Sequence, residues 1–442
     1  MNKFNIDQQR AIEHTGGPAL IIAGPGSGKT TVIIQRIARL TQKENVLPRH
    51  ILAITFTKAA AEEMENRYVR LTGFKCEGKD RVTFGTFHSV FLSVLKKYLK
   101  DFTPRLASHN ESLVILKHAV SKIYPDKAYT ADYYSELLSR ISKKKNSTIG
   151  NYEDSSGSDQ LKRIISEYDS LMHASGLIDF DDMLLLMLRL IKRDEHVLYE
   201  LRNTFRYLIL DEFQDINKLQ FEIIKLIGAP NNNVFAVGDD DQSIYGFRGS
   251  DPSIMLSFKK IYNAAEFITL RTNYRSEETI VNASLKLIAH NKNRYKKELK
   301  AARSGGKGID IRSFYGFEEC AHHIILDIKG YCGDKTCAVL FRTHRAGSKA
   351  AAIIAASDLF REGNISLMTF HASKGLEFDV VYIIEAMDRI TPGISRSAAE
   401  LEEERRMFYV AMTRAKEELH IFYTKNFYNT IRKRSRFINE ID

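Results

Sequence analysis

The chain has 442 residues, a length that fits about two to four domains with sizeable cores. Lysine and arginine exceed aspartate and glutamate by 65 − 55 = 10, which favours a polyanionic partner, although a solvated basic surface would give the same balance. The sequence contains no run of 18 apolar residues and no signal-peptide core, so we expect no membrane segment and a cytoplasmic location. The cysteines at 76, 320, 332 and 337 form no CxxC pair, which disfavours a zinc site or disulfide framework and favours reduced thiols.

Residues 1–17 predict a short helix that Asp7 caps. Gln8 and Gln9 of this helix are expected to face the ligand of residues 19–31, which are described next, although a solvated glutamine pair is the alternative. Beyond residue 50, strands are predicted at 51–57, 82–84, 207–212, 234–239, 266–270, 309–314, 337–341, 365–370, 379–384 and 419–423. A polar, alanine-rich helix is predicted at 58–70.

Residues 19–31, ALIIAGPGSGKTT, carry the clearest chemistry of the chain. An apolar run predicts a buried strand, a Gly/Ser loop follows it, and apolar residues at helical spacing predict a helix. Glycines let backbone N–H groups turn inward and a helix N-terminus adds positive dipole, so the pattern is typical of a phosphate cradle. Lys29 is expected to reach the β- and γ-phosphates, and the Thr30 hydroxyl to hold Mg²⁺. Ala23 departs from the strict P-loop pattern, which has glycine there.

Between residues 91 and 176 the pattern changes to helices with basic and tyrosine-rich faces, without phosphate chemistry. The lysine run 143–145 and the Ser/Gly-rich stretch 154–159 predict a loop. The basic runs fit a solvated face or a contact surface, and a solvated face is the commoner case. This stretch predicts an inserted helical subdomain.

Two adjacent acids, Asp211 and Glu212, end a predicted buried strand. Asp211 is expected to hold Mg²⁺, directly or through water, and Glu212 to orient and deprotonate an attacking water. The pair is a weak signal alone, but it gains weight about 180 residues after a P-loop and before Gln214 and Asp215. Gln242, in the loop after the next predicted strand, suits a side chain that senses a γ-phosphate.

Eight motifs in family order resemble those of UvrD/Rep/PcrA-type superfamily 1 DNA helicases, over residues 4 to about 423. The segments that carry the resemblance are FNIDQQ at 4–9, the P-loop at 23–30, TFT at 55–57 with GTFHS at 85–89, LDEFQD at 210–215, VGDDDQSIYGFRG at 237–249, NYRS at 273–276, TFHASKGLEF at 369–378 and EERRMFYVAMTRA at 403–415. The family commonly has alanine at the P-loop position of Ala23.

The resemblance implies ATP and Mg²⁺ as cofactors. It implies that Arg275 and Arg414 reach the γ-phosphate from the second domain, so that hydrolysis requires domain closure. Tyr274 is expected to stack near the adenine, and Glu377 to contact the ribose. The implied catalytic residues are Lys29, Asp211, Glu212, Gln242, Arg275 and Arg414, with Thr30 and Asp211 at the metal. The implied nucleotide-binding residues are Gln8, Gly24, Gly26, Ser27, Gly28, Lys29, Thr30, Thr31, Tyr274 and Glu377.

The resemblance also implies a track for single-stranded DNA, in which aromatic faces and cations bind bases and phosphates without sequence preference. Taken singly, each of the aromatic residues is more often part of a core. The family often has tryptophan where Phe247 stands, and this chain has no tryptophan. The implied DNA-binding residues are Phe56, Thr57, His88, Tyr245, Phe247, Arg248, Thr369 and His371.

The implied architecture is α/β, with two RecA-like parallel-sheet domains of the P-loop NTPase type and ATP at their interface. The first domain is expected over 1–90 and 177–261, with a helical 1B-like insertion at 91–176, and the second over 262–442. Typical members insert a large helical domain, called 2B, into the second. Only about 20 residues, 345–364, connect the two strands here, so we expect 2B to be absent.

We therefore expect an ATP-dependent DNA helicase that translocates 3′→5′ on single-stranded DNA and separates 3′-tailed duplexes, with an accessory protein partner as an option. The alternative is a translocase that strips or remodels protein–DNA complexes and unwinds little alone, because 2B is missing. A nucleotide-gated DNA-binding scaffold without turnover is disfavoured by the intact catalytic set. A P-loop kinase is disfavoured by the DNA-contact motifs.

Overall fold

The computed structural model describes residues 4–74, 78, 80–99, 104–127, 129–147, 159–331, 335–361, 365–395 and 397–441. The chain forms two compact units. The first unit comprises Met1–Ile21, Thr30–Gly238 and Tyr245–Ile268, and the second comprises Ile22–Lys29, Asp239–Ile244 and Thr269–Asp442. Two segments of the predicted first domain, the P-loop and the turn after residue 238, thus group with the second unit.

The main sheet of the first unit has six strands in the order β3-β2-β6-β7-β1-β8. Its pairs β2–β3, β2–β6 and β6–β7 are parallel, which confirms the α/β prediction. Every residue of β1, β2 and β7 is buried, as expected for strands covered on both faces. The strands span Ala19–Ala23 (β1), Ile51–Thr55 (β2), Thr83–Thr86 (β3), Tyr207–Leu210 (β6), Val234–Gly238 (β7) and Glu266–Leu270 (β8). The sequence placed 266–270 in the second sheet, and that placement was wrong.

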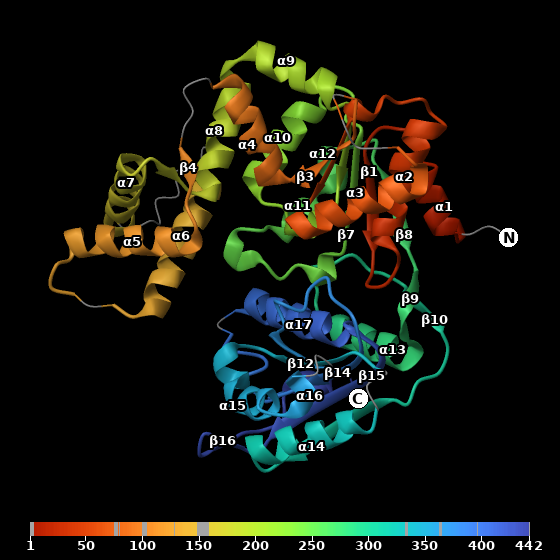
Figure 1. Ribbon diagram of the computed structural model, residues 1–442, viewed down its shortest axis with the longest axis vertical. Coiled ribbons are helices and arrows are strands. Elements are labelled where there is room, and N and C mark those ends of the chain that lie inside the picture. Colours follow the sequence, from red (N-terminus) through yellow and green to blue (C-terminus); the bar gives the residue numbers. More distant parts are fainter. Residues whose placement is uncertain are drawn as a thin grey trace. The chain divides into compact units, whose positions relative to one another are not determined.

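Helices and short 3₁₀ turns connect these strands (Figure 1). They are α1 (Ile6–Ile12), α2 (Lys29–Gln42), η1 (Pro48–His50), α3 (Lys58–Thr72), α4 (Phe87–Tyr98), α8 (Phe180–Arg193), α9 (Glu195–Thr204), η2 (Phe213–Asp215), α10 (Lys218–Gly228), η3 (Asp240–Gln242), η4 (Gly246–Arg248), α11 (Pro252–Leu256) and α12 (Phe258–Ile261). Asn5, not Asp7, caps α1, because the Asn5 side chain accepts from the Gln8 N–H while the Gln8 side chain accepts from the Asn5 N–H.

A helical subdomain lies between α4 and α8 in the chain. It contains β4 (Arg105–Leu106), α5 (His109–Ile123), α6 (Ala131–Ser147), α7 (Asp159–Ala174) and β5 (Leu177–Ile178), with β4 and β5 paired in parallel (Figure 1). Its helices share a core that includes Leu116, Ile141 and Tyr168. The sequence thus predicted this subdomain's helical character.

The lysine run 143–145 was predicted to be part of a loop with a solvated face, and both predictions were wrong for Lys145. The run lies inside α6, and the Lys145 side chain is only 6% exposed. Its Nζ lies 2.9 Å from Asp169, 2.7 Å from Asp179 and 2.7 Å from Asp182. Burial would lower the pKa of Lys145, but the three carboxylates raise it above its ordinary value. Of the loop predicted at 154–159, residues 154–158 lie outside the described residues, and Asp159 begins α7 instead.

The second unit is built on a five-stranded sheet in the order β11-β15-β14-β12-β13, in which every pair is parallel. Helices α13 and α17 pack on one face of this sheet, and α14 and α15 pack on the other (Figure 1). The elements are β9 (Thr272–Glu277), α13 (Glu278–Ile288), β10 (Lys300–Arg303), β11 (Ile309–Phe314), α14 (Phe317–Lys329), β12 (Cys337–Phe341), α15 (His344–Ala355), α16 (Asp358–Arg361), β13 (Ile365–Thr369), β14 (Phe378–Ile383), α17 (Ala398–Met412), β15 (Ala415–Thr424), β16 (Asn426–Phe427), β17 (Thr430–Ile431) and α18 (Arg436–Asn439).

The connection from β12 to β13 is an ordinary strand–helix–strand crossover in its described part, which holds α15 and α16. None of the described helices is long and apolar enough to cross a membrane. Cys320 and Cys337 are buried free thiols, while Cys76 and Cys332 lie outside the described residues.

Candidate functional site

The P-loop has the backbone shape of a phosphate cradle. It follows β1, and Gly26 and Gly28 adopt φ angles of +65° and +85°, in the left-handed region that favours glycine. The Ser27 hydroxyl donates to the Gly24 carbonyl at 2.8 Å and closes the loop on itself. The first turn of α2, which starts at Lys29, contains no acidic residue that would repel an anion. These features fit a bound phosphate group.

Residues of the second unit pack directly against this loop. The Tyr274 N–H donates to the Gly26 carbonyl at 2.9 Å. A Cβ at Gly26 would lie 2.5 Å from the Cβ of Arg275, and a Cβ at Gly24 would lie 2.5 Å from a methyl carbon of Leu299. Glycine is therefore required at Gly26 by space and by backbone conformation, whereas a side chain at Gly24 would force the Leu299 side chain to move.

Arg275 and Glu377, two predicted site residues from distant parts of the chain, form an ion pair. The Arg275 Nε lies 2.8 Å from a Glu377 carboxylate oxygen, and one Arg275 Nη donates to the Thr413 carbonyl at 3.3 Å. Burial would raise the pKa of Glu377, but the charges of Arg275 and Lys416 hold it below its ordinary value. Glu377 is therefore ionised at neutral pH.

Arg414 and Gln242, two more predicted residues, also meet. The Arg414 side chain is buried, and one Nη donates to Gln242 Oε1 at 3.3 Å. The Arg414 Nε and second Nη donate to the carbonyls of Val410 and Leu376, at 2.9 and 3.1 Å. Lys374 Nζ donates to the Gln242 carbonyl at 2.8 Å. The predicted γ-phosphate sensor and one predicted arginine thus lie in one hydrogen-bonded group.

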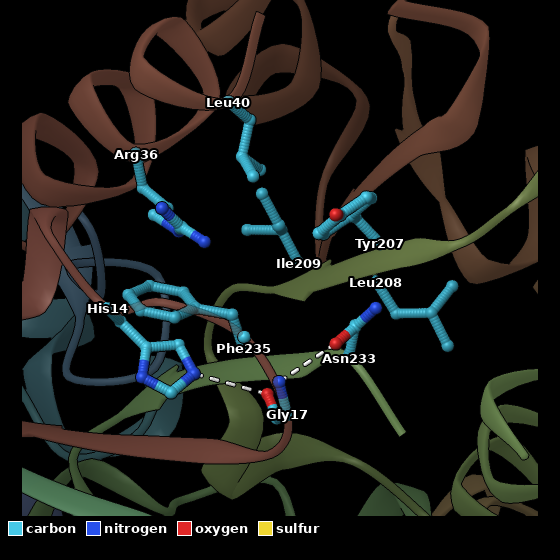
Figure 2. Close-up of a pocket in the computed structure, with 10 residues that line it drawn as sticks. His14, Gly17, Arg36, Leu40, Tyr207, Leu208, Ile209, Asn233 and Phe235 are labelled. Carbon is cyan, nitrogen blue, oxygen red and sulfur yellow. Dashed lines mark hydrogen bonds between the residues drawn. The ribbon is translucent and has the colours of Figure 1, made fainter. Parts of the chain in front are cut away.

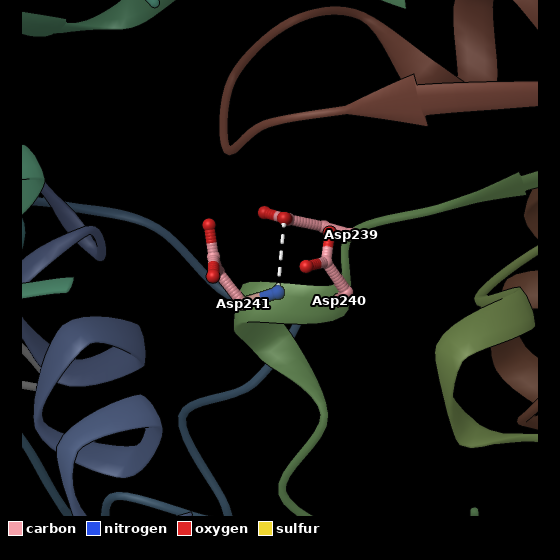
Figure 3. Close-up of side chains that lie close together, drawn as sticks. All are labelled: Asp239, Asp240 and Asp241. Carbon is pink, nitrogen blue, oxygen red and sulfur yellow. Dashed lines mark hydrogen bonds between the residues drawn. The ribbon is translucent and has the colours of Figure 1, made fainter. Parts of the chain in front are cut away.

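Three consecutive acids, Asp239, Asp240 and Asp241, place their carboxylates close together beside this group (Figure 3). Such a cluster could hold a metal ion, but here the Lys297 ammonium contacts all three carboxylates, at 2.6 Å from Asp240 and 2.8 Å from Asp241. Arg294 forms a two-pronged ion pair with Asp241, at 2.8 and 2.6 Å. A cation of the protein therefore occupies the place that a metal ion would take.

Sequence reasoning missed Lys297 and Arg294, which lie between the recognised motifs. Burial would lower the pKa of Lys297, but the three carboxylates raise it well above its ordinary value. One sequence signal was present: three successive acids in a buried turn require buried cations nearby, because an unpaired buried charge is costly.

Asp211 and Glu212 lie at the end of β6 in the first unit. The Asp211 N–H donates to the Ile54 carbonyl at 2.8 Å, and the Thr55 hydroxyl donates to an Asp211 carboxylate oxygen at 3.2 Å. Glu212 has a φ of +50°, a strained conformation for a residue with a side chain, and its carboxylate accepts from Gln214. Strain of this kind gathers at functional positions.

Aromatic residues of the predicted DNA track lie beside these acids in the first unit. Phe56 stacks on Tyr245 with ring centroids 5.1 Å apart, and Tyr245 lies 6.0 Å from Phe247, whose side chain is exposed. Phe56, Asp211 and Glu212 line one small cavity. The Ser139 hydroxyl of α6 donates to the Phe247 carbonyl at 2.7 Å and fixes this turn. Phe56 of the predicted DNA track thus lies next to Asp211 and Glu212.

Other predicted residues are placed less informatively. His88 packs edge-on against Phe180, and burial lowers the pKa of His88 to about 4, so it is neutral at pH 7. The Thr57 hydroxyl caps α3, and the Thr369 hydroxyl accepts from the Ala372 N–H. Thr30 and Thr31 lie in the first turn of α2, Gln8 lies in α1, and His371 lies in the turn after β13. The side chain of Arg248 lies outside the described residues.

A second small cavity, between His14, Arg36 and Phe235, has about 10 Å³, room for roughly one water (Figure 2). Figure 2 shows His14 and Asn233 both bonded to Gly17. Gly17 and Asn233 precede β1 and β7, so this cavity lies at the amino ends of the strands. The P-loop, Asp211 and Gln242 instead follow the carboxyl ends of β1, β6 and β7, where parallel sheets bind ligands.

Comparisons with known proteins agree with this geometry. The family model of the UvrD/REP helicase N-terminal domain matches residues 4–263, and that of the UvrD-like helicase C-terminal domain matches 268–359 and 348–426. The chain is 34% identical over 356 residues to "Putative ATP-dependent DNA helicase YjcD" of Bacillus subtilis, covering 78% of this chain and 46% of that protein. It is 34% identical over 361 residues to "ATP-dependent DNA helicase PcrA" of Staphylococcus aureus, covering 78% and 48%. It is 35% identical over 340 residues to "DNA helicase II" of Rickettsia typhi, covering 74% and 51%.

The chain thus spans about half the length of the curated relatives it matches. The N-terminal family model alone covers more than half of this chain, and the two models match its two halves in order. The chain belongs to the UvrD/Rep helicase family.

Proposed function

We propose that this chain is a DNA-dependent ATPase that uses ATP hydrolysis to move 3′→5′ along single-stranded DNA and to separate short 3′-tailed duplexes. The observation that carries the proposal is the grouping of P-loop, Gln242, Arg275, Glu377 and Arg414 through direct contacts among segments far apart in the sequence. The names of the three relatives support the same activity. The polarity rests on family resemblance.

In the proposed reaction, Glu212 takes a proton from water as the water oxygen attacks the γ-phosphorus. The bond between the γ-phosphorus and the bridging oxygen breaks, and ADP and inorganic phosphate are the products. The Lys29 ammonium and the guanidinium groups of Arg275 and Arg414 stabilise the negative charge that grows on the phosphoryl oxygens. Gln242 links this charge to Arg414 through the hydrogen bond described above.

Mg²⁺ is proposed as the metal ion, with the Thr30 hydroxyl and the Asp211 carboxylate as its protein ligands. Both offer the oxygen donors that Mg²⁺ prefers. When bound, Mg²⁺ neutralises charge on the nucleotide phosphates. The Thr55 hydroxyl would orient Asp211, because it donates to that carboxylate.

The DNA partner is proposed to bind along Phe56, Tyr245 and Phe247, with bases stacking on exposed aromatic faces at about 1–3 kcal/mol each. Binding should weaken steeply with salt, because cationic side chains displace counterions from the phosphates. No membrane partner is proposed.

A second candidate is a translocase that strips proteins from DNA and unwinds long duplexes only with an accessory protein. The short crossover from β12 to β13 favours it, because the family's 2B domain is inserted at this place. The length of duplex that the purified monomer can separate distinguishes the two candidates.

The test measures ATP turnover with and without single-stranded DNA, and strand displacement on 3′-tailed and 5′-tailed duplexes of increasing length. Lys29→Ala should abolish turnover, and Glu212→Gln should keep nucleotide binding and lose hydrolysis. Glu195→Gln, at an exposed position of α9, is the matched control. Near wild-type hydrolysis by Glu212→Gln, or displacement only from 5′ tails, would contradict the proposal.

A further inference from the structure

One segment of the second unit, residues 294–299 between α13 and β10, holds both the turn before Gln242 and the P-loop. The Arg294 guanidinium forms a bidentate ion pair with the Asp241 carboxylate, and the Tyr295 N–H donates to the Asp240 carboxylate at 2.7 Å. Lys297 contacts all three aspartates, as described above. Leu299 packs on Gly24, where a Cβ would lie only 2.5 Å from its methyl carbon. We call this the 294–299 strap.

The ion pairs that Lys297 of the strap forms with the three aspartates are buried from solvent. The Lys297 and Asp239 side chains are 0% exposed, and those of Asp240 and Asp241 are 1% exposed. The phenol of Tyr409, on α17, is also buried, and burial together with the charges of Asp239 and Asp241 raises its pKa. Lys297 and Arg294 bring two positive charges to the three carboxyl groups. Without Lys297 the three carboxylates would repel one another in a site that water does not reach.

Asp239 connects this cluster to Gln242. The Gln242 Nε2 donates to Asp239 Oδ2 at 2.6 Å, and the Gln242 N–H donates to the Asp239 carbonyl at 2.8 Å. With its amide nitrogen engaged there, Gln242 turns its Oε1 to Arg414. The direction of the Gln242 amide is therefore set through Asp239, and the place of Asp239 is set by Lys297.

We infer that Lys297 is a positioning residue for ATP hydrolysis, which holds the aspartate turn so that Gln242 is aligned with Arg414. This inference rests on the proposed function. Lys297 itself touches neither nucleotide nor water in this scheme; it acts through Asp239. A displacement of a catalytic side chain by about 1 Å can lower turnover by about 10²-fold, so a small movement of the turn suffices.

The test compares five proteins in single-strand-stimulated ATP turnover, with kcat and KM separated and melting temperature measured alongside. One of them, Gln242→Ala, gives the turnover without the Gln242 amide. Lys297→Met keeps the length of the side chain and removes its charge. Lys297→Met with Asp240→Asn restores the net charge, and the amide oxygen introduced by Asp240→Asn can still accept from the Tyr295 N–H. Lys296→Met, at the exposed neighbouring position, is the matched control and should match the wild type.

Lys297→Met should lower kcat by about 10²-fold while KM changes by less than about threefold, and the double variant should recover at least about tenfold of that loss. This recovery of kcat distinguishes the two roles. If Lys297 only stabilised the fold, the double variant would not regain kcat over a Lys297→Met protein of equal melting temperature. If Lys297→Met does not fold, the double variant alone decides: folded and active at near wild-type kcat supports the inference, and folded but as slow as a Gln242→Ala protein overturns it.

Two failures are distinguishable. A wild-type chain without DNA-stimulated turnover overturns the proposed function and the inference with it. Wild-type turnover together with an unchanged kcat in Lys297→Met, or with a kcat that falls only in proportion to the folded fraction, overturns the inference alone.

Discussion

Glu385 offers a stability prediction that does not depend on any activity. It follows β14 in the second unit, is 1% exposed, and has a φ of +58°. One carboxylate oxygen accepts from the Thr424 hydroxyl at 2.8 Å, and no described residue bonds the other. Burial raises the pKa of Glu385 from 4.5 to about 7. The folded state therefore holds this proton more tightly than the unfolded chain.

The magnitude follows from the two pKa values. Each pKa unit corresponds to about 1.4 kcal/mol, so ionised Glu385 lowers the free energy of unfolding by about 3 kcal/mol above the folded pKa. Because the folded pKa is raised, this loss begins near the unfolded pKa of about 4.5, grows as pH rises, and is nearly complete by about pH 8. Between about pH 5 and about pH 8 it changes by roughly 2.5 kcal/mol.

The assay is urea unfolding of wild type and Glu385→Gln at about pH 5 and about pH 8. The stability difference between variant and wild type should rise in favour of glutamine by roughly 2.5 kcal/mol across this range. Any pH-independent effect of the substitution cancels in this comparison. Glu318→Gln, at an exposed position of α14, is the control and should show a smaller change. A difference that is constant with pH would refute the argument from burial.

Three further predictions follow from other contacts. Lys145→Met should destabilise the first unit by about 3 kcal/mol in urea unfolding, because three carboxylates lose their buried cation, whereas Lys143→Met, exposed on the same helix, should change little. Gly347→Ala should lower the melting temperature although alanine favours helices, because its Cβ would lie 2.3 Å from the Phe341 ring, and a smaller residue at 341 should relieve the loss. Arg414→Lys should lower DNA-stimulated turnover by about 10³-fold, because an ammonium cannot reach all four acceptors that the guanidinium bonds, and unchanged turnover would contradict its assigned role.

The sequence predicted what local pattern controls. Apolar runs placed β11 and β12 at their observed bounds, and the glycines expected to let the P-loop backbone turn inward include Gly26 and Gly28, which have positive φ. It failed where tertiary pairing decides. Nothing local assigns β8 to the first sheet, because an apolar strand carries no sign of its neighbour.

The buried ion-pair partners of charged side chains were the second feature that the sequence did not predict. A lysine run predicts a solvated face, and only the fold shows that Lys145 meets three acids scattered over 169–182. Lys297 escaped notice for the same reason, since its farthest partner, Asp239, is 58 residues away in the chain. Motifs marked Arg275 and Glu377 as candidate site residues, because each motif marks its own position, but the ion pair between them was not predicted.

The anchoring of α6 has a mechanical consequence. Near its end, Lys145 and Asn146 tie the helix to the first turn of α8, and one hydrogen bond from Ser139 joins it to the backbone of Phe247. Three hydrogen bonds from Lys145 and Asn146 thus hold one end of α6, and a single hydrogen bond holds the helix at Ser139. A force on the helical subdomain would be transmitted through α6 to the turn at Phe247, and we expect the hydrogen bond from Ser139 to break before the contacts of Lys145 and Asn146.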